Sequence, residues 1–379
     1  MAKPTRNPFR FGDPVEGDYY LPRPGLTGSI RQFIENRIHV ILIGPRRFGK
    51  TSFVLNFLKE QEGRSQTCLF IDVFNVTSHK DFLQQIIRAL RSKQGWGDKL
   101  KDWVGSIPKL RPKLTADIDP ATGQSTFSLS TEFSANQEDI KDTIQDVLLG
   151  LQSLGDSAVI AIDEFQRISE LEDNGWLEAT LRTQMQQLKN TSFLFTGSRK
   201  SVIHEMINNP TRPFFRYCQS VDFPSFGEEF TDWIIDRFAS VDIQCEREAI
   251  SELRSFVQDT PNYIQMACFH LVAEGIVDVT RKSIKTVLQT IVKQNSYAYQ
   301  TILNSLTSLQ QRALRLCAKE SQQIFSKEFL EKYEIPNAPT LASSIKSLKD
   351  KQLLDEGTAK GKVFFDDPLF AIWLKNEFD

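Results

Sequence analysis

The feature that most constrains this chain is a glycine-rich loop between two apolar segments. Residues 44–51 read Gly-Pro-Arg-Arg-Phe-Gly-Lys-Thr and fit the pattern G-x(4)-G-K-[ST]. The apolar run Val40–Ile43 precedes the loop, and Thr51–Gln61 carries apolar residues at helical spacing. A buried strand, a glycine loop and an amphipathic helix in this order predict a phosphate-binding loop, because backbone N–H groups and a helix N-terminus then face the phosphates.

The loop side chains have separate predicted roles. Lys50 is expected to reach the β- and γ-phosphates of ATP, and the Thr51 hydroxyl to coordinate Mg²⁺. The alternative is a glycine turn with a solvated lysine, which the flanking strand and helix disfavour. The residues of the loop predicted to bind nucleotide are Gly44, Pro45, Arg46, Arg47, Phe48, Gly49, Lys50, Thr51 and Ser52.

A pair of acids follows a second apolar segment. Asp163 and Glu164 come directly after Ala158–Ile162, which has the composition of a buried strand. In a protein with a phosphate-binding loop, an acid at the carboxyl end of such a strand contacts the metal. A neighbouring glutamate can polarise the attacking water. We therefore predict Asp163 as a metal residue and Glu164 as the general base, whereas the alternative is a solvated helix start.

A polar strand end and three arginines complete the predicted site. Ser198 ends the strand-like segment 192–198, and its hydroxyl either touches the γ-phosphate or the water, or belongs to an ordinary turn. Both readings remain open. Arg199, Arg212 and Arg216 follow, and an arginine that reaches a γ-phosphate stabilises the charge of the transition state. We favour Arg216, from the same or a neighbouring subunit, while surface or ion-pair roles are the alternative for each arginine.

The order of expected elements indicates the fold class. Strand and helix patterns alternate over residues 1–225, which predicts an α/β fold: a P-loop NTPase parallel sheet with helices on both faces. Residues 226–318 are almost all helical by pattern, and three short helices followed by a hairpin end the chain. The parts we expect are a lead-in segment 1–28, a P-loop core 29–225 with an insertion 88–135, a helical lid 226–300 and a winged-helix domain 301–379.

Local patterns give further expectations. A short strand is expected at residues 18–21 and a helix at 29–36, starting at Ser29. Alternating segments at 114–118 and 125–130, with turn residues between them, predict a β-hairpin. The third helix of the winged-helix domain is expected at 340–351, with its outer face formed by Ser343, Ser344, Lys346, Lys349 and Lys351.

Charge excludes one class of protein and leaves another open. Lys and Arg number 46 against 48 Asp and Glu, so a globally basic nucleic-acid binder is excluded. Residues 88–113 nevertheless hold eight basic and two acidic residues, with Trp96 and Trp103 among them. This segment therefore remains a candidate for contact with DNA or a partner, although its tryptophans can equally pack under a loop. Residues 301–379 hold eleven of each sign, which favours packing or a protein partner over DNA for the winged helix.

Composition also bears on compartment and metal chemistry. No apolar run approaches 18 residues, so we expect no membrane span, and the first residues lack the apolar core of a signal peptide. The five cysteines form no CxxC pair and the four histidines show no metal-ligand spacing. We therefore expect a cytoplasmic protein without a disulfide framework or a zinc site.

The quoted segments resemble those of the archaeal-type ATPase family, AAA+-like P-loop NTPases related to the STAND group. The resemblance extends over nearly the whole chain. Its segments are Asn7–Val15, Gly44–Ser52, Asp163–Gln166, Gly197–Ser198, Pro213–Arg216, Phe223–Pro224 and Phe365–Leu374. The family implies ATP binding, slow hydrolysis coupled to assembly or switching, a helical lid and a C-terminal winged helix. It also implies a sensor role at Pro261, although Asp-Thr stands before this proline where relatives usually carry Gly.

Together these features predict a Mg²⁺-dependent, ATP-hydrolysing switch protein that self-associates and is coupled to double-stranded DNA or a protein effector. A mobile element, defence or regulation is the expected setting, by analogy alone. The alternative is a DNA-binding regulator or a scaffold in which ATP is mainly a structural ligand. A metabolic kinase is disfavoured, because no domain is left for a second substrate.

Overall fold

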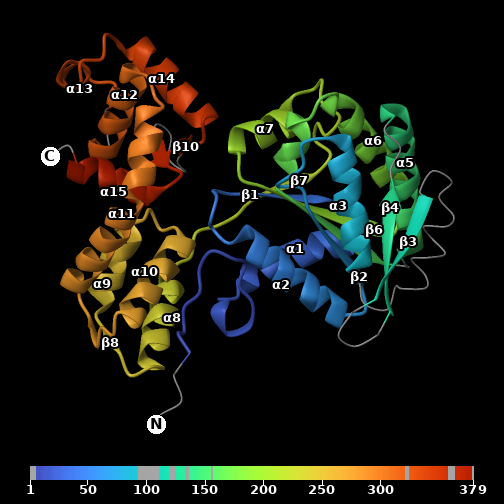
Figure 1. Ribbon diagram of the computed structural model, residues 1–379, viewed down its shortest axis with the longest axis horizontal. Helices are drawn as coiled ribbons and strands as arrows, with labels where there is room; N and C mark the ends of the chain where they lie inside the picture. Colours follow the sequence, from blue (N-terminus) through green and yellow to red (C-terminus); the bar gives the residue numbers. More distant parts are fainter. Residues whose placement is uncertain are drawn as a thin grey trace. The chain divides into compact units, whose positions relative to one another are not determined.

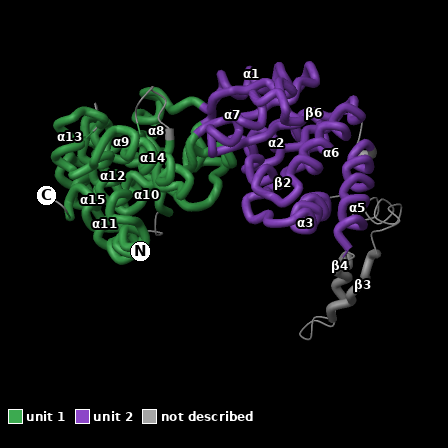
Figure 2. The backbone as a smooth tube through the Cα atoms, turned by 90° about the horizontal axis from the view of Figure 1, so that it is seen from above, with its two compact units in different colours: residues 1–21, 45–52, 224–379 green, residues 22–44, 53–223 purple. Residues whose placement is uncertain are grey.

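The computed structural model describes most of the chain, and its residues fall into two compact units (Figure 2). The described residues are 6–92, 111–118, 125–132, 136–154, 157–320, 324–356 and 363–377. Unit 1 comprises residues 1–21, 45–52 and 224–379, and unit 2 comprises residues 22–44 and 53–223. The phosphate-binding loop is thus grouped with the C-terminal part of the chain, whereas the strand before it belongs to unit 2.

Unit 2 is built on a five-stranded sheet in the order β2-β5-β6-β1-β7, and all its pairings are parallel (Figure 1). The strands are β1 (Val40–Ile43), β2 (Thr67–Asp72), β5 (Ala158–Asp163), β6 (Thr191–Gly197) and β7 (Gln219–Asp222). β6 lies between β1 and β5, so the strand before the glycine loop and the strand before the two acids are both its neighbours. The carboxyl ends of these parallel strands lie at one edge of the sheet.

Both faces of the central strands are buried, which explains their unbroken apolar sequences. The helices of unit 2 are α1 (Pro24–Glu35), α2 (Lys50–Gly63, whose first turn belongs to unit 1), α3 (His79–Arg91), α5 (Gln137–Gly150), α6 (Asn174–Gln187) and α7 (Lys200–Asn208). Side chains of α3, α5, α6 and α7 share one hydrophobic core with alternate residues of the strands. Phenylalanine fills much of this core: the rings of Phe165 and Phe195 lie 4.2 Å apart, and Phe214 packs against both.

Most of the insertion expected at 88–135 lies outside the described residues, including Trp96 and Trp103 of the basic segment. The hairpin within it is confirmed. β3 (Arg111–Ile118) pairs antiparallel with β4 (Ser125–Glu132), with Leu114 opposite Leu129. Short 3-10 helices at Leu151–Leu154 (η2) and Phe165–Glu170 (η3) flank β5.

Unit 1 contains the expected helical segment and a C-terminal domain of winged-helix outline. The lid elements are α8 (Glu228–Ala239), β8 (Gln244–Cys245), α9 (Arg247–Phe256), α10 (Pro261–Ala273), β9 (Asp278–Val279) and α11 (Arg281–Asn304). The C-terminal elements are α12 (Ser308–Lys319), α13 (Lys327–Lys332), α14 (Ala338–Asp350), β10 (Leu354–Glu356), β11 (Val363–Phe365) and α15 (Pro368–Glu377). β10 and β11 pair antiparallel, so the three helices and the hairpin occur in the expected order.

The structure corrects some local expectations. Residues 18–21 do not form a strand, because a 3-10 helix (η1) occupies Gly17–Tyr19. The helix expected from Ser29 begins earlier, at Pro24, since proline is favoured in the first turn, where its missing N–H costs nothing. Ser344 does not belong to the outer face of α14: it is buried, and its hydroxyl donates to the Thr340 carbonyl at 3.0 Å.

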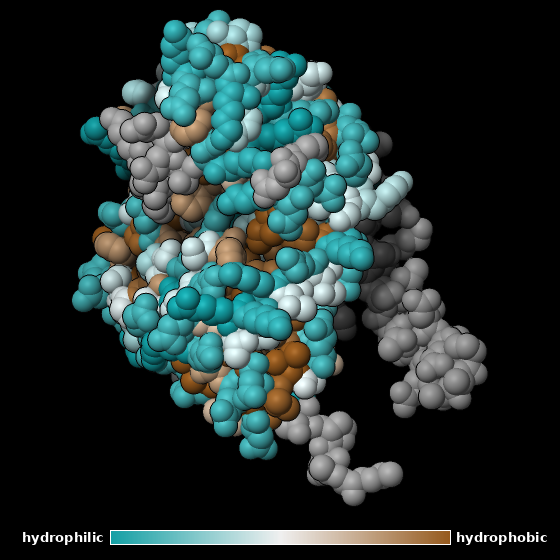
Figure 3. Space-filling model, turned by 90° about the vertical axis from the view of Figure 1, so that its left-hand side faces the viewer, coloured by the Kyte–Doolittle hydropathy of each residue, from teal (hydrophilic) through white to brown (hydrophobic). Residues whose placement is uncertain are grey.

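The surface seen in Figure 3 is mainly hydrophilic, with apolar residues exposed in separate places. The large apolar side chains that are exposed belong to different elements and loops of the described chain: Ile38, Phe74, Leu149, Phe256, Val277, Tyr297 and Phe325. Among the described residues, no helix is both long and apolar enough to cross a membrane.

Candidate functional site

The glycine loop follows β1 directly and turns into α2 at Lys50. Two of its residues have positive φ, Arg47 at 62° and Gly49 at 90°, and this sharp path is the reason that glycine is needed at position 49. The Lys50 side chain is buried, and its ammonium donates to the Pro45 carbonyl at 2.8 Å. The predicted phosphate-binding lysine is therefore folded over the loop that it would serve.

Gly44 is required for a packing reason. A Cβ atom at this position would lie 2.8 Å from the Cβ of Phe223, closer than real Cβ atoms approach. The Gly44 N–H donates to the Gly197 carbonyl at 3.2 Å, which ties the end of β1 to the end of β6. The glycine thus brings the start of the loop close to its neighbouring strand.

Within unit 1, the two arginines of the loop contact residues from far along the chain. The Arg46 guanidinium lies 3.9 Å from the Asp366 carboxylate, and both side chains are about one fifth exposed (23% and 20%). Arg47 donates to the Tyr263 hydroxyl and lies over the ring of the same tyrosine, 5.0 Å from its centroid. Burial raises the pKa of the Asp366 carboxyl, and the positive charges of Arg46 and Arg47 oppose this shift.

Asp367 extends these contacts into the lid and the winged-helix domain. Its Oδ2 accepts a hydrogen bond from the Tyr299 hydroxyl of α11 at 3.2 Å, and its Oδ1 accepts from the Leu369 N–H at 2.9 Å. The second bond caps the first turn of α15. Burial, followed by the charge of Asp367, raises the pKa of both Tyr263 and Tyr299, so both phenols stay protonated.

Pro261, expected to have a sensor role, is the first residue of α10 and is buried. The next N–H, that of Asn262, donates to the Arg47 carbonyl at 3.4 Å, so this helix begins against the glycine loop. The N-terminal segment also joins this region. The Gly12 N–H donates to Asn262 Oδ1 at 2.9 Å, and the Val15 N–H donates to the Ser52 hydroxyl at 3.0 Å.

In unit 2, the two predicted acids lie at the end of β5 beside the end of β6. Asp163 is buried, and Thr196 donates a hydrogen bond to its Oδ1. The same Thr196 hydroxyl accepts from the Glu164 N–H at 3.2 Å. Glu164 has a left-handed backbone, with φ at 57°. The Thr196 bridge therefore fixes both acids relative to β6, which offsets the cost of that backbone conformation.

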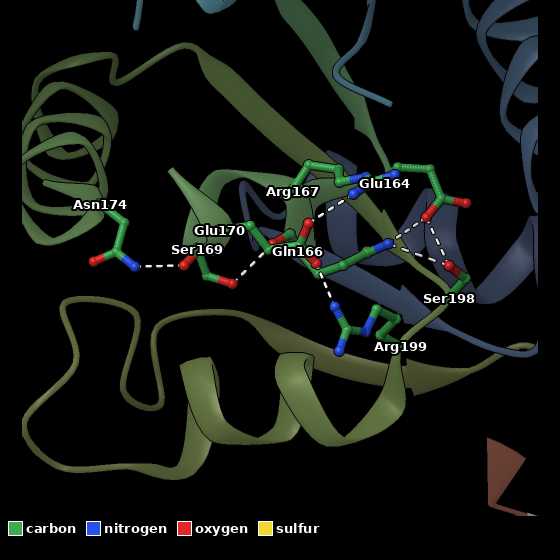
Figure 4. Close-up of polar contacts among 8 residues, drawn as sticks. All are labelled: Glu164, Gln166, Arg167, Ser169, Glu170, Asn174, Ser198 and Arg199. Carbon is green, nitrogen blue, oxygen red and sulfur yellow. Dashed lines mark hydrogen bonds and ion pairs between the residues drawn. The ribbon is translucent and has the colours of Figure 1, made fainter. Parts of the chain in front are cut away.

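Ser198 and Gln166 complete this cluster (Figure 4). The Ser198 hydroxyl donates to Glu164 Oε2 at 2.7 Å. The amide nitrogen of Gln166 donates to the same oxygen, and to the Ser198 hydroxyl at 3.2 Å. In this structure Ser198 is thus a partner of the predicted general base.

The three candidate arginines have different surroundings. Arg199 pairs with Glu170, which also binds Arg167 at 2.7 Å (Figure 4). Arg212 pairs with the buried carboxylate of Glu178. Burial raises the pKa of this carboxyl, and the positive charge of Arg212 opposes the shift. Arg216 is exposed, has a positive φ of 49°, and makes no ion pair within the described part of the chain. Of the three, Arg216 is the side chain left available to another molecule.

The structure thus brings together Asp163, Glu164 and Ser198 in unit 2, and the loop residues and Pro261 in unit 1. Thr196 was not predicted as a site residue, although a polar residue between the apolar run Phe193–Phe195 and Gly197 was a detectable signal. Sequence reasoning noted Gln166 only as part of a resembling segment. It missed the partners of the arginine pair, because no local pattern connects Arg46 to Asp366 across such a distance in sequence.

The fold and this set of residues define a P-loop NTPase. A family model described as "AAA domain" matches residues 34–203, and one described as "Probable winged helix domain" matches residues 297–376. The chain therefore contains an AAA domain followed by a C-terminal winged helix domain, and the expected fold class is confirmed.

Solved structures share this architecture over nearly the whole chain. A Walker-type ATPase of Pyrococcus abyssi has a TM-score of 0.64 at 15% identity, covering 94% of this chain and 97% of its own. The ORC2 protein of Aeropyrum pernix, in ADPNP–ADP complexes, has a TM-score of 0.54 at 15% identity, with 93% and 92% covered. The ORC1 protein of the same organism, in complex with DNA, has a TM-score of 0.50 at 12% identity, with 95% and 94% covered. A search of the curated proteins gave no match.

Proposed function

We propose that this protein is a Mg²⁺-dependent ATPase that works as a switch, in which the bound nucleotide sets the position of the lid and the winged-helix domain. Lys50 and the loop N–H groups bind the phosphates, and Glu164 is the general base. The four-part division into a lead-in 1–28, core 29–225, lid 226–300 and winged helix 301–379 is part of this proposal.

The residues present suit a magnesium ion. Asp163 and Thr51 offer a carboxylate and a hydroxyl oxygen, the hard donors that Mg²⁺ takes together with water and substrate phosphates. The Thr196 hydroxyl donates to one oxygen of Asp163, which orients the carboxylate as a ligand needs. The ion, when bound, would neutralise charge on the β- and γ-phosphates.

One observation carries the switch proposal: the arginine pair inside the glycine loop binds side chains of the lid and of the winged-helix domain. Arg46 binds Asp366, and Arg47 binds Tyr263. Phosphate oxygens are strong competitors for an arginine held by one half-buried carboxylate, because guanidinium groups bind phosphates with two donors. A nucleotide therefore biases the C-terminal part only as far as it takes these arginines from their partners.

Hydrogen–deuterium exchange of the full chain with no nucleotide, ADP or a non-hydrolysable ATP analogue tests this proposal. We expect exchange over residues 353–377 to differ between the ADP and analogue states, and the difference to vanish in Lys50→Ala. The matched variant Arg312→Ala removes an arginine of the same domain that pairs with Glu334 instead, and should keep the difference. Identical exchange in all nucleotide states of the wild type would refute the switch.

Coupling to double-stranded DNA or a protein effector, and self-association, belong to the same proposal. The outer face of α14 offers Ser343 and Lys346, both exposed, and the structural relative from Aeropyrum pernix was solved with DNA. The exposed Arg216 suits a contact with ATP of a neighbouring copy. Turnover measured with and without duplex DNA distinguishes coupling to DNA from coupling to a protein effector. Stimulation that falls steeply with salt supports DNA, whereas unchanged turnover supports a protein effector.

A further inference from the structure

A buried amide next to the predicted general base has no role in the site described so far. Gln166 lies on η3, only 1% of its surface is exposed, and its amide faces Glu164 and Ser198 (Figure 4). An ionised carboxylate can only accept hydrogen bonds, so the atom of the amide that faces Glu164 must be the nitrogen. Both N–H groups of Gln166 are thus used, one on Glu164 and one on Ser198.

The hydrogen bonds on Glu164 are unequal. Its Oε2 accepts from Gln166 and from the Ser198 hydroxyl, the latter at 2.7 Å. Its Oε1 accepts none from the described residues. Two donors on one oxygen fix the rotation of the carboxylate, because turning it would leave two buried donors without an acceptor. The other oxygen remains available to a water molecule.

The surroundings hold Gln166 in place. The ring of the preceding residue, Phe165, packs against Phe195 and Phe214, which fixes the start of η3. Gly197 leaves the space that the amide occupies: a Cβ atom there would lie 3.0 Å from Gln166 Oε1 and 2.6 Å from the side chain of Ile203. Gln166, Ser198 and Gly197 therefore form one rigid support for Glu164.

We propose that Gln166 and Ser198 are positioning residues that aim Glu164 Oε1 at the attacking water, an inference that rests on the proposed ATPase chemistry. In that step the water loses a proton to Glu164 Oε1, and its oxygen forms a bond to the γ-phosphorus. The bond between the γ-phosphorus and the β,γ-bridging oxygen breaks, and its electron pair leaves with ADP. Gln166 gives up no proton in this step.

The test compares Gln166→Met with wild type in the full chain, since methionine keeps most of the volume and removes both donors. We expect kcat to fall about 10-fold to 100-fold, as for a misaligned catalytic group, while the Kd for ADP stays within about 2-fold. Gln184→Met is the matched control, because Gln184 is a buried glutamine of α6 outside the cluster, and its turnover should stay near wild type.

A double-mutant cycle separates positioning from general support of the fold. In a Glu164→Gln background, Gln166→Met should cause almost no further loss, because it acts only through the carboxylate. An equal loss in both backgrounds would overturn the proposal. Ser198→Ala, which removes a single oxygen atom, should show the same non-additivity and covers the case of an unstable Gln166→Met protein.

The outcomes also distinguish this inference from the function beneath it. A wild type without turnover, with or without Mg²⁺, would overturn the ATPase chemistry and this role together. A wild type with turnover that Glu164→Gln abolishes, but that Gln166→Met leaves unchanged, would overturn the positioning role alone.

Discussion

The two groups of candidate site residues, one in each unit, are held together in different ways. Most hydrogen bonds of the cluster around Glu164 join residues 32 to 34 positions apart, at the ends of two adjacent strands, and its polar side chains are almost all buried. The arginine pair of the loop binds partners far along the chain, Tyr263 being 216 positions from Arg47, and the Arg46–Asp366 pair is partly exposed. Neighbouring strands fix the first set, whereas the second depends on how separate domains pack.

This difference teaches which part of the site is suited to move. Breaking a buried hydrogen-bond network leaves donors unsatisfied, which costs about 1–3 kcal/mol for each group. A partly exposed ion pair is worth about 1 kcal/mol or less, and it can exchange its partner for water or phosphate. We therefore expect the Glu164 cluster to set the chemistry, and the arginine pair to respond to the nucleotide.

The largest expected effect tests whether the Glu164 cluster sets the chemistry. Glu164→Gln should lower kcat by about 100-fold to 10,000-fold, the range for loss of a general base, and leave ATP binding intact. Lys50→Ala should instead weaken ATP binding itself. Phosphate release and equilibrium nucleotide binding, measured on both variants, would check this. If Glu164→Gln lost binding as severely as Lys50→Ala, the two groups would not have separate tasks.

An intermediate effect concerns the strand that carries the cluster. Burial lowers the pKa of His39 from 6.5 to about 4, and its Nδ1 accepts a hydrogen bond from the Phe193 N–H of β6 at 3.2 Å. The folded state thus disfavours the protonated ring. The free energy of unfolding should fall as the pH drops from about 6.5 towards 4, by roughly 3 kcal/mol, and level off below.

Chemical unfolding between pH 4 and pH 7 measures this dependence. His39→Asn is the informative variant, because its amide oxygen can accept the Phe193 hydrogen bond without titrating. The variant should lack the part of the pH dependence that His39 contributes. The same slope in both proteins would show that carboxylates elsewhere cause the pH dependence of unfolding, and that His39 does not contribute to it.

The smallest expected effect concerns the arginine pair of the glycine loop. Tyr263→Phe removes the hydroxyl that Arg47 binds and keeps the ring. Arg47 then has one competitor fewer, so the Kd for ATP should fall about 3-fold to 10-fold, which corresponds to about 1 kcal/mol. Turnover at saturating ATP should change less than affinity. Calorimetric titration gives the affinity, and a weaker affinity would show that Tyr263 places Arg47 for phosphate binding.

The sequence was informative wherever the chemistry is local. The loop, the two acids and the strands before them could be located because apolar runs and glycines mark a buried strand and a tight turn. The helix start was missed at Pro24, because Ser29 is an equally acceptable first residue by pattern alone. The winged helix was found from the order of its elements, but the buried side of α14 at Ser344 was not.

The contacts that were missed are those made by tertiary packing. Thr196 belongs to the cluster because β6 lies between β1 and β5, and strand order cannot be read from separate apolar runs. Asp366 and Asp367 were noted only as part of the resembling segment Phe365–Leu374, and their bonds to Arg46 and Tyr299 depend on domain packing. Sequence patterns therefore predicted the parts of the site but not the connections between them.

The two hydrogen bonds that the Asp367 carboxylate accepts set a limit on how strongly the nucleotide can control the C-terminal helix. This carboxylate caps α15 and holds Tyr299 at the same time. A cap of this kind is worth about 1 kcal/mol, which corresponds to a population ratio of about 5 to 1. A nucleotide acting through this residue would bias two arrangements of the domain without locking either. A partner that binds one arrangement could then supply the remaining preference, and ATP would decide only how readily it does so.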